Sequence, residues 1–223
     1  MSTTKPSDYR NLLVALPILT LWFALIFAGN VVGLFQAGPG EPPLNLFLAI
    51  LVPPGLFAVA YRSLSGFRAF VLSLDLRLIT MFQSWRVVGA SFLYLYAFSV
   101  VPAIFAFPAG WGDIAIGVTA PFYAFALISG KGFSKRAFAT WNVLGIFDLA
   151  VAATLGALAA PGPQGILAGE ITTEAVSMLP LSLIPTFLMP LFTILHIAAL
   201  IKVAKIPIPG KQQLSQQSVP QIA

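Results

Sequence analysis

Residues 11–29 read NLLVALPILTLWFALIFAG, and this stretch decides the class of fold. It contains no charged residue, and a helix of this length crosses about 30 Å of hydrocarbon. Comparable apolar runs recur along the chain. Of its 223 residues 58% are hydrophobic and only 9% are charged, whereas a soluble domain has about 25% charged residues. The mean hydropathy is +0.92. The sequence therefore predicts an all-α membrane protein.

The apolar runs predict six transmembrane helices. The expected boundaries are approximately 11–35, 44–64, 83–106, 109–129, 137–160 and 178–204. They divide the chain into an N-terminal segment (1–10), a transmembrane domain (11–204) and a tail (205–223), whose polar and aperiodic sequence predicts disorder. The first helix follows a basic start, as a signal peptide does. Its apolar run is longer than that of a signal peptide, so we expect this helix to be retained.

The basic residues predict how the chain is oriented. All twelve Lys and Arg residues fall at the N-terminus, in or beside the second and fourth connections, or after the sixth helix. The other three connections carry only Glu41, Glu170 and Glu174. Cytoplasmic loops of membrane proteins are enriched in Lys and Arg, so both termini are expected in the cytoplasm, with the bacterial inner membrane as the expected location. The net charge of +5 then reflects topology, and no nucleic-acid partner is expected.

Residues 66–82, GFRAFVLSLDLRLITMF, form the one long segment outside the predicted spans. Its leucines alternate as in a strand, while Phe67, Phe70, Leu74 and Leu78 also fit one face of a helix. A lone strand at a membrane surface would leave its backbone groups unpaired. We therefore expect an amphipathic helix on the cytoplasmic surface.

Two similar hexapeptides open the third and fifth predicted helices. They are SWRVVG (84–89) and TWNVLG (140–145). Both helices are expected to run from inside to outside, so the match predicts a parallel repeat of helix pairs, as some transporters have. In the alternative interpretation, Trp85 and Trp141 anchor at the membrane interface and the glycines are packing contacts.

Polar residues inside the predicted spans define the candidate site, because a charge at membrane depth costs about 2.5–3.5 kcal/mol. Asp148 lies midway along the fifth helix and is the expected titrating group. The other candidates for a proton or solute pathway are Arg86, His196, Asn142 and Asp113. Gln83 falls toward the inner side with Arg86, and Asn30 toward the outer side. The alternative interpretation of each polar residue is a hydrogen bond that ties helices together.

Several kinds of chemistry have no candidate residues in this sequence. There is no cysteine and only one histidine, so no thiol nucleophile, disulfide or multi-histidine metal cluster is expected. No nucleotide-binding loop is visible. We therefore predict no catalytic residue, no metal and no cofactor.

The stretch FPAGWGDIAIG, Phe107–Gly117, allows two interpretations. In the first, residues 108–112 form the outer turn before the fourth helix, and Asp113 caps that helix in its first turn. In the second, GWGD resembles the Gly-x-Gly-Asp motif of intramembrane aspartyl proteases, which implies that Asp113 and Asp148 share a proton.

The chain departs from this protease pattern in its order of residues. In the presenilin-like members the other aspartate comes earlier, within Tyr-Asp, whereas here it follows as Phe147-Asp148. No Pro-Ala-Leu follows. The predicted helix boundaries also place the two aspartates roughly 12 Å apart along the membrane normal. We therefore expect Asp113 to be structural.

The sequence leaves three functional hypotheses. The leading one is a small proton- or cation-linked transporter that is not an enzyme. The second is a non-catalytic membrane scaffold or accessory subunit, and the third is an intramembrane aspartyl protease using Asp113 and Asp148. Besides the lipid bilayer, the expected partners are a proton or small solute, and a second copy of the chain or another membrane subunit.

Overall fold

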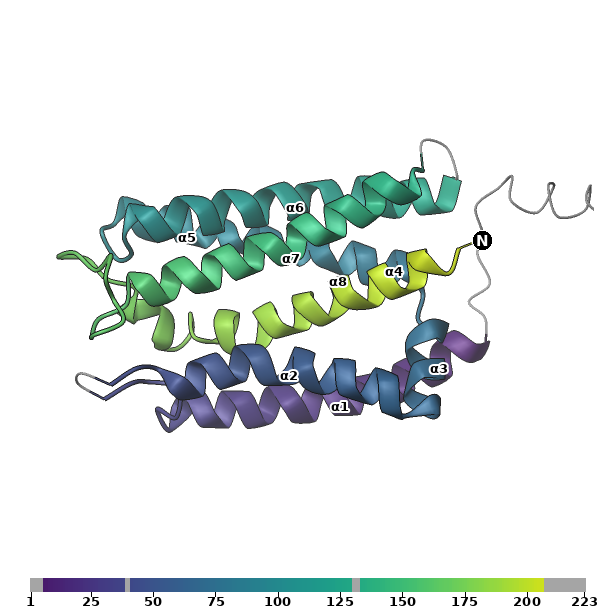
Figure 1. Ribbon diagram of the computed structural model, residues 1–223, viewed down its shortest axis with the longest axis horizontal. Coiled ribbons are helices and arrows are strands. Elements are labelled where there is room, and N and C mark those ends of the chain that lie inside the picture. The colour runs from purple at the N-terminus through teal and green to yellow at the C-terminus, as the bar shows by residue number, and fades with distance from the viewer. Residues whose placement is uncertain (1–5, 39–40, 130–132, 207–223) are drawn as a thin grey trace, which may run out of the picture.

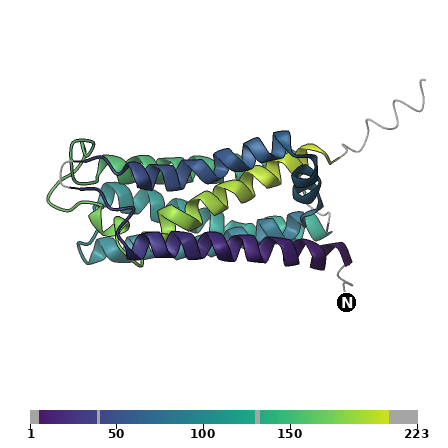
Figure 2. The ribbon, with the colours of Figure 1, turned by 90° about the horizontal axis from the view of Figure 1, so that it is seen from below.

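The computed structural model describes residues 6–38, 41–129 and 133–206, with side chains from residue 13 onward. Within these residues the chain is helical and contains no strand. The long helices lie side by side along one axis and form an elongated bundle (Figure 1). One of them, α8 (Met189–Ala204), runs obliquely across its neighbours (Figure 2). Most of the tail for which disorder was predicted lies outside the described residues.

In the part of the chain that the structure describes, five helical segments are long and apolar enough to cross a membrane. They lie in α1 (Pro6–Val31), α2 (Leu44–Ser63), α6 (Ala103–Ser129), α7 (Lys135–Leu158), and the π-helical turn η3 (Ile184–Leu188) continued by α8. Large apolar side chains on their outer faces are exposed, among them Leu13, Leu21 and Leu25 of α1. Contiguous apolar surface of this extent is suited to lipid rather than to water.

The third predicted helix differs from expectation in both its boundaries and its form. The chain runs without interruption through α4 (Leu76–Phe82), the 3₁₀-helix η1 (Gln83–Gly89) and α5 (Ala90–Ala97). Figure 1 shows α4 and α5 at opposite ends of the bundle. This segment therefore traverses the bundle, but it begins before residue 83 and ends well before residue 106.

The amphipathic helix predicted over 66–82 is divided in two. Its first part, α3 (Ser65–Ser73), lies across the end of the bundle (Figure 1) with Val71 buried. The second part belongs to α4, whose Ile79 and Thr80 are buried. Asp75 caps the second helix, because its side chain accepts a hydrogen bond from the backbone N–H of Arg77 at 2.8 Å. An aspartate at this position is a strong helix start.

The prediction of a turn at residues 108–112 is wrong, because these residues lie within a helix. The chain turns instead at residues 98–102, where Ser99 has a φ of 56°. Helix α6 begins at Ala103, directly after Pro102, and continues through Pro108 and both glycines of GWGD. Proline readily begins a helix, and proline and glycine are both more common within membrane helices than within soluble ones. Asp113 is therefore ten residues inside α6 and does not cap it.

Small residues on the inner face of α6 let η1 approach its backbone. The buried positions of α6 include Ala106, Ala109, Gly110, Gly117 and Ala120. A Cβ built on Gly117 would lie 2.7 Å from the backbone nitrogen of Val87. Such stripes of small residues are typical of close helix contacts in membranes.

Basic side chains hold the end of the bundle where α3 lies. Lys135 donates to the carbonyls of Ala204 (3.1 Å) and Ile206 (2.9 Å) at the end of α8. Arg68 donates to the carbonyls of Tyr61 (3.1 Å) and Arg62 (2.6 Å) in the last turn of α2. The Lys202 ammonium likewise donates to the carbonyl of Leu72 near the end of α3. Cations are favourable here because the last carbonyls of a helix lack partners and carry partial negative charge.

A matched pair of glycine substitutions tests the packing of η1 on α6. Gly117→Ala should destabilise the fold by about 1–3 kcal/mol, because the new methyl group meets backbone at a close contact. Gly55→Ala in α2 should instead stabilise it by about 0.5–1 kcal/mol, since nothing lies within 4 Å of a Cβ there. Thermal unfolding of the two purified variants in detergent measures both effects. Equal melting temperatures would contradict the close approach.

Candidate functional site

The site begins with the geometry of η1. A 3₁₀-helix has three residues per turn, so residues three apart lie above one another on one face. The buried residues of η1 are Gln83, Arg86 and Gly89, which have this spacing. An α-helix would rotate each of them by about 60° from the one before. The 3₁₀ geometry therefore places the Arg86 side chain and Gly89 on one face of η1, where both contact Asp113 of α6.

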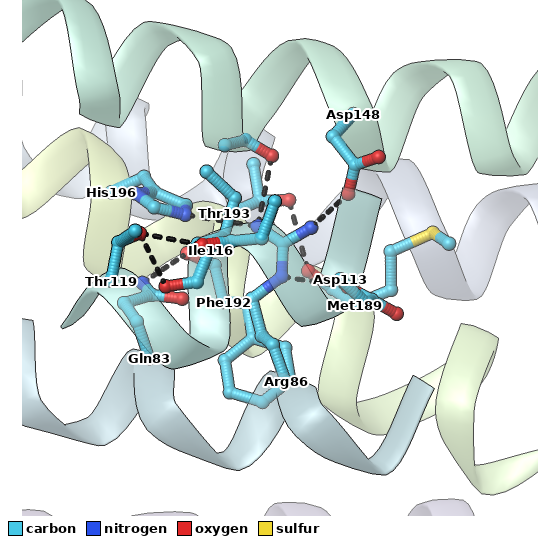
Figure 3. A network of polar contacts seen from close by, with 12 residues as sticks. Gln83, Arg86, Asp113, Ile116, Thr119, Asp148, Met189, Phe192, Thr193 and His196 are labelled. Carbon is cyan, nitrogen blue, oxygen red and sulfur yellow. Dashed lines mark hydrogen bonds and ion pairs between the residues drawn. The ribbon is translucent and has the colours of Figure 1, made fainter. Parts of the chain in front are cut away.

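Arg86 is the centre of a polar network inside the bundle (Figure 3). Its side chain is 0% exposed. Its Nε donates to Oδ1 of Asp113 in α6 at 2.7 Å, and its Nη2 donates to Oδ2 of Asp148 in α7. Its Nη1 donates to the carbonyl of Gly145 at 3.0 Å and contacts Nε2 of His196 at 3.2 Å. Four of the five guanidinium N–H groups thus have partners on three other helices.

Glycines make room for the charged groups. A Cβ on Gly89 would overlap the Asp113 carboxylate, and one on Gly112 would overlap the Asp148 carboxylate. The second glycine of GWGD is therefore required by the approach of α7, and no turn forms there. Each carboxylate has one oxygen on Arg86 and places the other against a glycine.

The donors and acceptors of the network fix the form of the histidine. Because a guanidinium only donates, His196 must accept at Nε2, and its ring is neutral. Its proton then lies on Nδ1, which is 2.9 Å from Oδ1 of Asn142. The Asn142 amide donates in turn to the Phe138 carbonyl at 2.8 Å. His196 thus orients Arg86 and does not carry a charge in this state.

The two similar hexapeptides use the same local arrangement. In SWRVVG, Arg86 pairs with Asp113, whose carboxylate lies over the final glycine of the motif. In TWNVLG, Asn142 pairs with His196, whose ring lies over the final glycine of that motif. The third positions, which differ in residue, and the sixth, which are both glycine, therefore have the same roles in both hexapeptides, which favours the interpretation as a repeat.

The tryptophans of the two motifs differ in their surroundings. Trp85 is exposed on the outside of the bundle, as an interfacial anchor would be. Trp141 is buried, donates from Nε1 to Thr119 Oγ1 at 2.8 Å and packs edge-on against His196. Interfacial anchoring therefore does not account for Trp141.

Charge is not balanced within the cluster. Arg86 carries one positive charge and is the only basic residue among the buried side chains of the described chain. Asp113 and Asp148 carry two negative charges when ionised, and their side chains are 13% and 14% exposed. With a neutral His196, the cluster has a formal charge of −1. It becomes neutral by taking up one proton or one monovalent cation.

A cavity connects the cluster with one end of the bundle. Its volume is about 160 Å³, and it is lined by α2, α5, α6, α7 and the segment around η3. Asp113 forms part of its wall, while residues from the loops that follow α1 and α7 form its mouth. Asp113 is therefore open to a ligand entering from the end opposite α3.

The structure brings together the five residues that the sequence proposed as a pathway, and one inference about them was wrong. The predicted separation of Asp113 and Asp148 along the membrane normal does not hold, because both carboxylates bind the same guanidinium. Two other polar residues form separate contacts: Asn30 donates to Thr186 Oγ1 at 3.1 Å, and Gln83 donates to the Phe192 carbonyl at 3.3 Å.

The sequence reasoning missed the glycines as parts of the site. Gly89 and Gly145 each lie three residues after a polar residue on the same helix face, and this spacing is the signal that could have revealed them. No group of three or more His, Asp or Glu side chains is placed to hold a metal ion within residues 6–38, 41–129 and 133–206.

Within the described residues, five apolar helices and a charged cluster inside the bundle indicate an all-helical integral membrane protein. Residues 43–204 match the family described as a domain of unknown function, DUF8737, and the chain belongs to that family. Neither the curated proteins nor the solved structures contain a match to the chain.

Removing the central guanidinium should strongly destabilise the fold. Arg86→Met leaves two carboxylates buried without a cation, and breaking a buried charge pair costs about 3–5 kcal/mol. Thermal unfolding in detergent measures the loss. The triple variant with Asp113→Asn and Asp148→Asn should recover much of it.

The control for this substitution is Arg77→Met. Arg77 also pairs with an aspartate, Asp75, but its side chain is 47% exposed, and an exposed pair contributes about 0–1 kcal/mol. Similar losses in the two variants would contradict the burial of the Arg86 network.

The protonation of the histidine can be observed directly, because the chain has only one. Nitrogen-15 NMR of histidine-labelled protein in lipid should show a neutral ring with the proton on Nδ1. Asn142→Leu removes the acceptor for that proton and should shift the resonance. A ring protonated at Nε2 would contradict the hydrogen bond from Arg86.

Proposed function

We propose that the protein is a small proton- or cation-linked membrane transporter in which Arg86, Asp113 and Asp148 form the ion-binding cluster. The observation that carries the proposal is that one guanidinium binds two carboxyl groups inside an apolar bundle, so that the cluster has a formal charge of −1 when both are ionised. A charge at membrane depth is costly unless it is neutralised. Uptake of a proton or cation neutralises the cluster, and its release restores the charge, so occupancy of the site is linked to the stability of the surrounding helices.

We infer that α4, η1 and α5 together form a sixth transmembrane span. Residues 76–97 have a combined length of roughly 36 Å with the rises of the two helix types, and the hydrocarbon core is about 30 Å thick. No single helix within this segment reaches the usual length, because η1 interrupts it. Six spans place both termini on the side where the basic residues lie, which is the cytoplasm by the positive-inside bias, and we propose the bacterial inner membrane as the location.

The arrangement of cavities and packing supports alternating access. On the outer side, the cavity reaches Asp113. On the inner side, a buried apolar cluster separates the network from the cytoplasmic end, and it includes Val71 of α3, Ile79 of α4, Phe138 and Trp141 of α7, and Val203 of α8. We assign this arrangement to an outward-open state, in which release to the cytoplasm requires these residues to separate.

The contacts of the carboxylates favour ion binding over proteolysis. An aspartyl protease pairs two carboxyl groups that share one proton and act on water. Here the Arg86 guanidinium donates a separate hydrogen bond to each carboxylate. Because both carboxylates bind the Arg86 guanidinium, this arrangement supports a role of the two aspartates in balancing charge.

Proton movement in liposomes tests the proposal. Purified protein is reconstituted with a pH-sensitive dye inside, and a potassium diffusion potential supplies the driving force. We expect wild-type protein to move protons and Asp148→Asn to reduce the rate at least about tenfold, because the neutral amide cannot take up a proton. The amide oxygen can still accept from Arg86, so folding should be preserved.

Glu170→Gln is the control, since it removes an acidic charge from an exposed loop position and should leave the rate unchanged. Absence of proton movement in the wild type, together with weaker oligomer or subunit assembly in Asp148→Asn, would instead indicate the scaffold. Cleavage of a membrane peptide that either aspartate substitution abolishes would indicate the protease.

A further inference from the structure

The polarity of the side chains that line the outer cavity changes along its length. Its walls are mostly apolar, with Leu46, Ile50, Leu149 and Met189 among the aliphatic side chains. Uncharged polar side chains gather toward the loops at its mouth and comprise Gln36, Gln164, Thr173 and Ser177. A ligand with an apolar body therefore fits the interior of the cavity.

The charged residues that line the cavity are all acidic. Asp113 lies at its inner end and Glu174 belongs to η2 (Glu174–Ser177) near its mouth, and no Lys or Arg lines it. Oδ1 of Asp113 accepts from Arg86, and no hydrogen bond to its second oxygen is found among the described residues. Negative charge along such a path attracts cations and repels anions.

Aromatic rings surround the same space. Phe47, Phe92, Phe105 and Phe192 all line the cavity, and the rings of Phe92 and Phe105 lie edge to face at a centroid distance of 4.9 Å. The face of an aromatic ring attracts organic cations, including quaternary ammonium groups. A metal ion gains little from such walls, whereas an amine with an apolar substituent uses both the rings and the carboxylate.

We infer that this cavity binds a small organic cation, an amine or quaternary ammonium group with an apolar substituent, whose charged group lies at Asp113. The inference rests on the proposed function in that Asp113 belongs to both sites, and it names the class of substrate. A cavity of about 150 Å³ in another protein holds benzene, so about 160 Å³ suits a single ring or a short branched chain. Binding of the cation at Asp113 supplies the positive charge that the deprotonated cluster lacks, so that the cation takes the place of the proton that would otherwise neutralise it.

Binding of three ligands of similar size tests the charge preference. Isothermal titration of the purified full chain in detergent compares benzylammonium, benzyl alcohol and benzoate. Benzylammonium should bind at least about tenfold more tightly than benzyl alcohol, because a carboxylate in an apolar site attracts a cation strongly. Benzoate should not bind. Equal binding of benzylammonium and benzyl alcohol would overturn the inference and indicate a cavity for lipid chains.

Two variants locate the binding. Gly156→Leu adds a side chain to the cavity wall, where a Cβ has room at 3.5 Å from the ring of Phe105, and it should abolish benzylammonium binding. Ala150→Leu adds a side chain to the exposed face of the same helix and should not change it. Unchanged affinity in a folded Gly156→Leu protein would overturn the assignment of the cavity.

The charge at the inner end is tested by Asp113→Asn, which should weaken benzylammonium binding at least about tenfold and leave that of benzyl alcohol unchanged. The same preparations are assayed for proton movement in liposomes. Benzylammonium binding without proton movement would overturn the transport proposal and leave the cation site intact. Proton movement without benzylammonium binding would overturn the cation site alone.

Discussion

The burial of one guanidinium constrains the rest of the bundle. A charge that water cannot reach must be satisfied by the protein, and Arg86 obtains its partners from α6, α7 and α8. Reaching all three requires an unusually close approach of the helices. Glycine occupies the points of contact for this reason, and the 3₁₀ form of η1 aligns the guanidinium with them. Packing, glycine positions and local helix type thus follow from one electrostatic requirement.

Composition predicted the five spans that the described residues contain as long apolar helices, whereas it did not predict where the helices begin and end. Apolar runs identify helices in lipid because no other open structure satisfies the backbone there. Boundaries depend on turns, and proline and glycine are ambiguous signals inside a membrane. The sequence FPAGWGD was interpreted as a turn, and the start of α6 was placed six residues late. That error moved Asp113 by about 9 Å along its helix, enough to separate it from Asp148. Asp75, a helix-capping residue within the segment 66–82, marked another helix boundary that the prediction of a single helix overlooked.

The sequence predicted which residues form the site better than it predicted how they are arranged. Polar residues in apolar spans are few and must find one another, so depth and composition selected Arg86, Asp148, His196 and Asn142 correctly as neighbours. The predicted helix boundaries placed Asp113 too far from Asp148. The chain of donors and acceptors that makes His196 neutral could not be derived, since it depends on which nitrogen faces Arg86. The environments of Trp85 and Trp141 differ for the same reason: equivalent positions in similar motifs face different neighbours.

The lysines and arginines at the end of the bundle where α3 lies have two roles at once. Arg68, Lys135 and Lys202 contribute to the charge asymmetry along the chain, and each also donates to carbonyls at a helix terminus. An experiment that relocates positive charges in order to invert the protein in the membrane would also leave three helix ends uncapped. Poor yield from such variants would then report lost stability as much as altered insertion. Replacing Arg62 or Arg136 instead would change the charge asymmetry while leaving these three side chains in place.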